Sequence, residues 1–140
     1  MEQEYRVEDA KDFQSTINLL EDRVYEFNSN KITQNDGAFF AKIVQDENSS
    51  VAAGIAGWTW ACACEITLLW VSEALRGKGL GKKLLTAAEN EAKARKCKTI
   101  LVRSYSFQAP GFYEKNGYKV EFVVENFPEG YNYFTLKKIL

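Results

Sequence analysis

Residues 76–83, RGKGLGKK, combine three alternate glycines with four cationic side chains and lead directly into a helix-forming run. Glycine lowers the stability of a helix, so three glycines at a helix start need another explanation. The N-terminus of a helix leaves backbone N–H groups without partners and carries a partial positive charge, and both features favour an anion. Because glycine adopts positive φ angles and lets the backbone approach a ligand closely, this stretch predicts a phosphate-binding loop.

The spacing of this loop excludes two common phosphate-binding motifs. A Walker loop would need glycine where Arg76 stands and Ser or Thr where Lys83 stands. The dinucleotide fingerprint G-x-G-x-x-G also fails, because Lys82 occupies the position of its third glycine. The residues from Arg76 to Gly81 instead match the pattern R-x-x-G-x-G.

A second motif lies further along the chain. Residues 106–120, SFQAPGFYEKNGYKV, contain the pattern A-x-x-F-Y-E-K-x-G-Y from Ala109 to Tyr118. Together with R-x-x-G-x-G and the preceding segment LLWVSEAL at 68–75, this motif resembles the GNAT superfamily of N-acetyltransferases. The resemblance covers residues 51–139 and departs from the family pattern at Ser106, where many members have asparagine.

The resemblance implies both a fold and an activity. The fold is a single α/β domain over residues 1–140, with a mixed, mostly antiparallel central sheet flanked by helices. The activity is direct transfer of the acetyl group of acetyl-CoA, in a ternary complex and without a metal, to a primary amine. The expected acceptor is a small molecule ahead of a protein, and the enzyme can form a homodimer. The resemblance assigns acetyl-CoA binding to Leu69, Trp70, Val71, Arg76, Gly77, Lys78, Gly79, Leu80, Gly81, Lys82, Ala109 and Phe112.

Tyr113 is the residue that the resemblance assigns as general acid. Acetyl transfer needs a proton for the departing thiolate, and a phenol with a pKa near 10 stays protonated at neutral pH. The alternative is that Tyr113 is a half-buried aromatic residue packed beside Phe112.

The remaining two catalytic tasks fall on the strand before the loop. The family stabilises the oxyanion with a backbone N–H group, here near Val71, and a β-bulge in this strand would free such groups. Some members carry a glutamate base at the position of Glu65. The alternatives are a water chain, a substrate that is already neutral, and a solvated glutamate with no role as base. Strand alternation predicts that Glu65, Thr67, Leu69 and Val71 share one face.

The periodicity of the chain predicts the elements that position these residues. Apolar residues at helical spacing predict a helix over 11–28 and a second one over 79–95. The composition of residues 50–72 predicts two strands with a turn near Ala61 to Glu65. Trp58 and Trp60 then lie on the same face of the first strand, where they belong either to the core or to the acceptor site. Further strands are expected at 37–46, 98–107 and on both sides of the turn at 128–130, with a short helix from Pro110 to the cap at Gly117.

Composition excludes several other classes of protein. The net charge of −1 argues against a nucleic-acid-binding protein, and the absence of histidine argues against a metal site or a Ser-His or Cys-His mechanism. No apolar run reaches the roughly 20 residues of a membrane span. The polar N-terminus is not a signal peptide, and Cys62, Cys64 and Cys97 are expected to be reduced, so we expect a cytoplasmic protein. The main rival to an enzyme is a non-catalytic domain that binds or senses acyl-CoA.

Overall fold

The computed structural model describes residues 4–140. The chain divides into two compact units, of which the first ends at Asn35 and the second begins at Asp36. The first unit contains α1 (Phe13–Ile32). The carboxylate of Asp12 caps this helix by accepting a hydrogen bond of 3.1 Å from the backbone N–H of Ser15. The helix predicted over 11–28 is therefore confirmed and extends further toward the C-terminus. No helix within residues 4–140 is long and apolar enough to cross a membrane.

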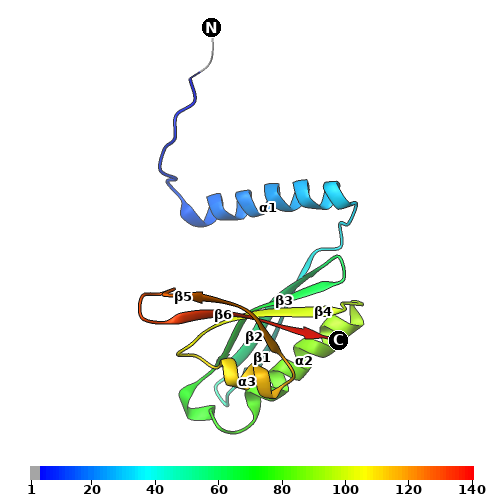
Figure 1. Ribbon diagram of the computed structural model, residues 1–140, viewed down its shortest axis with the longest axis vertical. Coiled ribbons are helices and arrows are strands. Elements are labelled where there is room, and N and C mark those ends of the chain that lie inside the picture. Colours follow the sequence, from blue (N-terminus) through cyan, green and yellow to red (C-terminus); the bar gives the residue numbers. More distant parts are fainter. Residues whose placement is uncertain (1–3) are drawn as a thin grey trace. The chain divides into compact units, whose positions relative to one another are not determined.

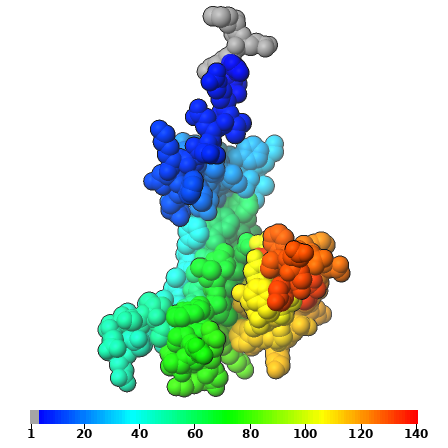
Figure 2. Space-filling model, turned by 90° about the vertical axis from the view of Figure 1, so that its left-hand side faces the viewer, coloured from blue at the N-terminus to red at the C-terminus, as the bar shows by residue number. Residues whose placement is uncertain are grey.

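The second unit is a six-stranded sheet with two α-helices (Figure 1). The strand order is β1-β2-β3-β4-β6-β5, and only the β3–β4 pair is parallel, so the predicted mixed, mostly antiparallel sheet is confirmed. Figure 2 shows β4 in yellow beside the β5–β6 hairpin in orange and red. The elements are β1 (Ala38–Gln45), β2 (Val51–Trp60), β3 (Ala63–Val71), a 3-10 turn (Glu73–Leu75), α2 (Leu80–Ala94), β4 (Thr99–Tyr105), α3 (Pro110–Lys115), β5 (Lys119–Glu125) and β6 (Asn132–Ile139).

The hydrophobic core lies on one face of this sheet, which we call the inner face. Helix α2 packs on β1, β2 and β3, and α3 packs on β5 and β6. The stripe of α2 that faces the sheet ends in Ala88 and Ala92, which are fully buried and whose small side chains let the helix approach closely. The core of the inner face also includes Ile55, Leu85, Ile100 and Leu136.

Three chain reversals or helix ends lie where the sequence predicts them. The hairpin between β2 and β3 turns at Ala61 and Cys62, whose φ angles of 50° and 62° are typical of a two-residue hairpin turn. Pro110 occupies the first turn of α3, where its missing N–H costs nothing, and Gly117 follows the helix with a φ of 91°. All three turn predictions are confirmed.

A β-bulge at Thr67 changes the geometry of β3. Ile66 pairs with Gly57 and Leu68 pairs with Ala56, so Thr67 is an extra residue with no residue opposite it in the β2 register. Its hydroxyl donates a hydrogen bond of 3.2 Å to the carbonyl oxygen of Ala56. The parallel ladder between β3 and β4 ends at Ile66 and Val102, one residue before the bulge. Beyond this point the two strands no longer pair, and the bulge expected in this strand is confirmed.

The bulge also corrects one prediction about side-chain direction. Cross-strand partners share a face, and Glu65 pairs with Trp58, whereas Leu69 pairs with Ile55 on the buried inner face. The prediction that Glu65 shares a face with Leu69 and Val71 is therefore wrong, because one inserted residue reverses the alternation. Glu65 lies on the opposite face, which we call the outer face.

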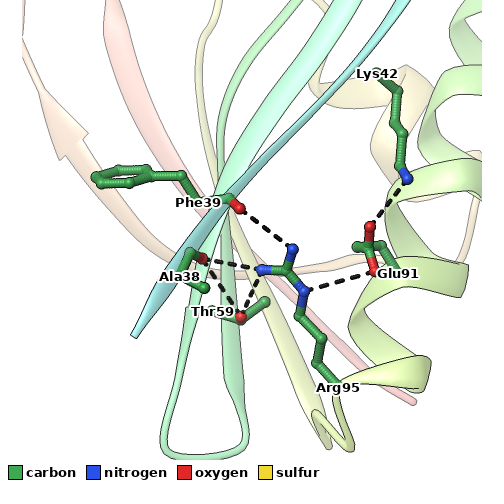
Figure 3. Close-up of polar contacts among 6 residues, drawn as sticks. All are labelled: Ala38, Phe39, Lys42, Thr59, Glu91 and Arg95. Atoms are coloured by element: carbon green, nitrogen blue, oxygen red, sulfur yellow. Dashed lines mark hydrogen bonds and ion pairs between the residues drawn. The ribbon is translucent and has the colours of Figure 1, made fainter. Parts of the chain in front are cut away.

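The C-terminal end of α2 is joined to β1 and β2 by Arg95 (Figure 3). Its guanidinium donates hydrogen bonds to the carbonyl oxygens of Ala38 and Phe39, at 3.0 and 3.2 Å, and to the hydroxyl of Thr59 at 3.0 Å. Glu91 pairs with Arg95 and also accepts a hydrogen bond from Lys42 at 2.9 Å, and both cations lower the pKa of its carboxyl. These contacts fix the edge of the sheet to the helix that carries the glycine loop.

Candidate active site

A cleft of about 710 Å³ opens where β3 and β4 stop pairing. One side of the cleft is β3 after the end of the ladder, and the other is the part of β4 that pairs only with β6. The glycine loop and α3 complete the lining, which consists of residues 66–71, 75–77, 79–82, 102–104, Gln108, Ala109, Phe112 and Tyr113. Eleven of the twelve residues predicted to bind acetyl-CoA lie in this lining, and Lys78 does not.

The N-terminus of α2 supplies hydrogen-bond donors to the cleft. Its first helical hydrogen bond runs from the N–H of Lys83 to the carbonyl oxygen of Gly79, at 3.2 Å. The N–H groups of Leu80, Gly81 and Lys82 precede this bond, and no side chain caps the helix at Gly79. All three residues line the cleft, so the partial positive charge of the helix end is available to an anion there.

The three glycines of the loop adopt two different backbone conformations. Gly77 and Gly79 both have a φ of 77°, a left-handed conformation that glycine adopts without strain. Gly81 is helical, and a β-carbon there would make an ordinary van der Waals contact with α3, at 3.5 Å from Cζ of Phe112. The expected positive φ angles are therefore found at two of the three positions.

Two cationic side chains of the loop lie at the cleft. Arg76 lines it and donates a hydrogen bond of 3.1 Å from Nε to the carbonyl oxygen of Val71, which ties the loop to the end of β3. Lys82 lines it from the first turn of α2. Together with the helix end, these two charges make this part of the cleft suited to a phosphate.

Tyr113 lines the cleft from α3, and only 7% of its surface is exposed. Its ring meets those of Phe112 and Tyr118 edge-on, at centroid distances of 5.2 and 5.7 Å. Burial raises its pKa above the ordinary value of a phenol, so Tyr113 stays protonated at neutral pH.

Tyr118 is the nearest alternative proton donor, but its hydroxyl is already engaged. It donates a hydrogen bond of 3.0 Å to Glu89, whose carboxylate also pairs with Lys138. Burial and this neighbouring carboxylate raise the pKa of Tyr118 even further. Because Tyr118 lies outside the cleft lining, Tyr113 is the tyrosine that meets the cleft.

Glu65 lies near the cleft but outside its lining. Its carboxylate accepts a hydrogen bond from Nη1 of Arg103, the residue of β4 that follows the end of the parallel ladder. Arg103 itself lines the cleft. The ion pair therefore spans the two strands on the outer face, close to the point where they separate.

Comparison with known proteins identifies the family. The profile of the acetyltransferase (GNAT) family matches residues 4–118, and this match spans both units of the structure. The chain belongs to the GNAT acetyltransferase family. It is 36% identical to the blasticidin-S acetyltransferase of Streptomyces morookaense, over 72% of this chain and 75% of that protein. It is 29% identical to acetyltransferase Atu2258 of Agrobacterium fabrum, over 71% of this chain and 72% of that protein.

A solved structure supports the same assignment. The crystal structure of an acetyltransferase from Bacillus cereus ATCC 14579 matches with a TM-score of 0.80 and 29% identity, covering 97% of this chain and 98% of that chain. The protein is therefore an acetyltransferase, and the resemblance carried by its two motifs is confirmed.

Several lining residues of this acetyltransferase were missed by the sequence analysis. Arg103 and Ser104 enter the cleft only because β4 is the parallel neighbour of β3, which no local pattern reveals. Gln108 lines the cleft while its side-chain oxygen accepts a hydrogen bond of 2.8 Å from the N–H of Tyr105. Its place just before Ala109 in the second motif is a signal that could have found it.

Proposed function

We propose that this acetyltransferase moves the acetyl group of acetyl-CoA to the primary amine of a small molecule, by direct attack within a ternary complex. The observation that carries the proposal is the cleft between β3 and β4, which joins an anion-binding helix end to a buried, protonated tyrosine. An elongated substrate with phosphates at one end and a thioester at the other fits such a cleft.

The residues at the helix end suit the pyrophosphate of acetyl-CoA. We assign its oxygens to the N–H groups of Leu80, Gly81 and Lys82, with Arg76 and the Lys82 side chain adding charge. Beyond Ile66, alternate backbone groups of β3 point toward the side from which β4 has separated. We assign these groups to the amide-bearing arm of the substrate and to the oxyanion that forms near Val71.

The proposed reaction has three parts: attack of the amine on the thioester, cleavage of the C–S bond, and proton transfer. The amine nitrogen bonds to the carbonyl carbon of the thioester, and the C–S bond then breaks to release a thiolate. Tyr113 gives its proton to that thiolate. A primary amine has a pKa near 10.4, so it is mostly protonated at neutral pH and loses two protons during the reaction. The base takes the first proton before attack, and the second, released from the nitrogen after attack, restores the proton that Tyr113 gave to the thiolate. We assign Glu65 as the base. Its carboxylate lies outside the cleft lining, where it pairs with Arg103, so we infer that the proton reaches it through water.

The acceptor and the setting of the enzyme are part of the same proposal. A relative is named for blasticidin S, so blasticidin S is the first acceptor to assay. Cys62, Cys64 and Cys97 are free thiols, in keeping with the reducing cytoplasm in which we place the enzyme. The homodimer expected from the family resemblance stays a prediction for a measurement of molecular mass in solution.

A release assay tests the proposal. The protein is incubated with acetyl-CoA and a panel of amines that includes blasticidin S, and free thiol is measured together with the acetylated product. We expect amine-dependent thiol release, and a rise in melting temperature on adding acetyl-CoA alone. A melting-temperature rise without release on any amine would favour the acyl-CoA-sensing alternative, and the absence of both would exclude acetyl-CoA as a substrate.

A further inference from the structure

Five aromatic rings form a contiguous cluster next to the cleft. Tyr105 and Phe107 stack with centroids 5.2 Å apart and ring planes 4° from parallel, and Tyr105 also contacts its cross-strand partner Tyr133 at 4.5 Å. Tyr131 meets Phe107 edge-on at 5.1 Å, and Phe127 lies 5.5 Å from Tyr133. We call these residues the aromatic cluster.

Backbone hydrogen bonds hold the two segments that carry the aromatic cluster. Ser106 donates its N–H to the carbonyl oxygen of Asn132 at 2.8 Å, and the N–H of Asn132 donates to the Ser106 hydroxyl at 3.0 Å. Within the β5–β6 loop, the N–H of Phe127 donates to the carbonyl oxygen of Tyr131 at 3.0 Å. These bonds hold together the backbone segments that carry the rings.

Burial in the core does not account for the cluster. Phe107, Phe127 and Tyr131 are 58%, 52% and 50% exposed, although each contacts another ring of the cluster. A contiguous set of exposed apolar rings on ordered loops is typical of a binding surface, because exposing them to water costs free energy.

The aromatic cluster lies outside the cleft lining but adjoins it along the chain. Arg103 and Ser104 line the cleft directly before Tyr105, and Gln108 lines it directly after Phe107. Tyr105 lies on the outer face of the sheet with Arg103, because side chains two residues apart on a strand point to the same side. Arg103 forms an ion pair with Glu65, which offsets its positive charge. Its repulsion of a cationic amine between the aromatic cluster and the cleft is therefore reduced.

We propose that the aromatic cluster is the acceptor subsite of this enzyme and selects amines that carry a planar unsaturated ring. The proposal rests on the function proposed above. A planar ring can lie against the exposed face of Phe107 and meet the Tyr131 ring as Phe107 itself does, in the offset or edge-on arrangements that aromatic pairs prefer. A saturated ring of similar size is not flat and has no π system, so it packs on these rings without the added attraction between aromatic pairs.

Two probes that differ only in the ring test this inference. 2-Phenylethylamine and 2-cyclohexylethylamine carry the same amine on the same two-carbon chain. Their kcat/KM values are measured by thiol release, and their binding to the CoA-saturated protein by equilibrium dialysis. We expect a preference of about ten-fold for the phenyl compound in both measurements, the size of effect expected from one or two aromatic contacts.

Matched variants locate the source of the preference. Phe107→Leu and Tyr131→Leu remove a ring and should reduce the preference to below about three-fold, whereas Phe107→Tyr and Tyr131→Phe retain it. Phe39→Leu serves as the control, because Phe39 is 77% exposed on β1, away from the cluster. All five variants should keep the melting-temperature rise produced by acetyl-CoA, which shows that fold and cofactor binding are intact.

The outcomes separate this inference from the proposed function. If both amines are acetylated with equal kcat/KM, the inference is overturned and the acetyl-transfer proposal stands. If ring-dependent binding is found without thiol release, the subsite stands and the proposed activity fails. If the phenyl compound does not bind, or if the Leu variants keep the full preference, the aromatic cluster is not the acceptor subsite.

Discussion

At the scale of single residues, two tyrosines on either side of a helix end carry the same group in different environments. Tyr113 meets the cleft, whereas Tyr118 donates its hydroxyl to Glu89. Burial raises the pKa of both phenols, so ionisation does not distinguish them, and access to the cleft does. The chemistry proposed for Tyr113 therefore depends on its position.

Replacing Tyr113 by phenylalanine tests that assignment directly. The substitution keeps the ring and removes only the proton donor, so we expect turnover to fall by at least about ten-fold, toward the 10²–10⁴ typical of a general acid. The dissociation constant of acetyl-CoA should change little, because the hydroxyl acts mainly in the transition state. Tyr118→Phe is the matched control and should leave turnover near that of the unmodified enzyme. Full turnover in Tyr113→Phe, with chemistry shown to be rate-limiting, would make Tyr113 a packing residue.

At the scale of elements, the two ends of helix α2 have different functions. The N-terminal end presents donors to the cleft, and the C-terminal end is held to β1 and β2 by Arg95 (Figure 3). Substitutions at the two ends should therefore separate cofactor binding from stability.

Gly79→Val should greatly reduce the melting-temperature rise that acetyl-CoA produces. The left-handed φ of 77° costs a residue with a β-carbon about 1–2 kcal/mol, and the added side chain stands at the N-cap where we place the phosphates. Gly111→Ala is the control, because a β-carbon there has no neighbour within 4 Å and Gly111 is not part of the cleft lining. An unchanged rise in Gly79→Val would mean that the phosphates bind elsewhere.

Arg95→Lys should destabilise the fold by about 2 kcal/mol in urea unfolding while leaving acetyl-CoA binding intact. Lysine cannot reproduce the planar fork that reaches two carbonyl oxygens and the buried Thr59 hydroxyl together, and lost hydrogen bonds to charged groups cost in this range. Lys42→Met removes a more exposed ion pair and should cost less than about 1 kcal/mol. A loss near zero in Arg95→Lys would argue that Arg95 acts only through its charge on Glu91, which lysine retains.

At the scale of the whole molecule, the folded chain holds protons that the unfolded chain releases at high pH. Burial raises the pKa of the Cys64 thiol from 9.0 to about 12, and the pKa of Tyr118 is also raised. The unfolded state therefore loses its proton first as pH rises, and the free energy of unfolding falls with pH over that interval. Below pH 9 the Cys64 contribution is fully present.

Urea unfolding across this interval checks the sign and the source of the effect. We expect the midpoint to fall steadily between pH 9 and about 12, and to fall less steeply in Cys64→Ala, which removes the ionising group from a buried site. An identical slope in Cys64→Ala would assign the alkaline loss to other groups, with Tyr118 the first to examine.

The sequence by itself determined the features of this protein that depend on neighbours along the chain. The glycine loop at the start of α2, the proline that opens α3 and the glycine that follows it were all predicted, because a turn or a helix end is governed by the few residues that form it. The same local motifs carried the family resemblance and, with Tyr113 included, twelve of the residues that line the cleft.

The tertiary structure decided which segments meet. The bulge at Thr67 places Glu65 on the outer face and not with Leu69. One residue inserted in β3 relative to the β2 register reverses the alternation of the side chains that follow it. The pairing of β4 with β3 brings Arg103 to the cleft, and its pairing with β6 brings Tyr105 to Tyr133. These contacts join residues far apart in the chain, and periodicity reports only how a segment alternates and not which strand will lie beside it.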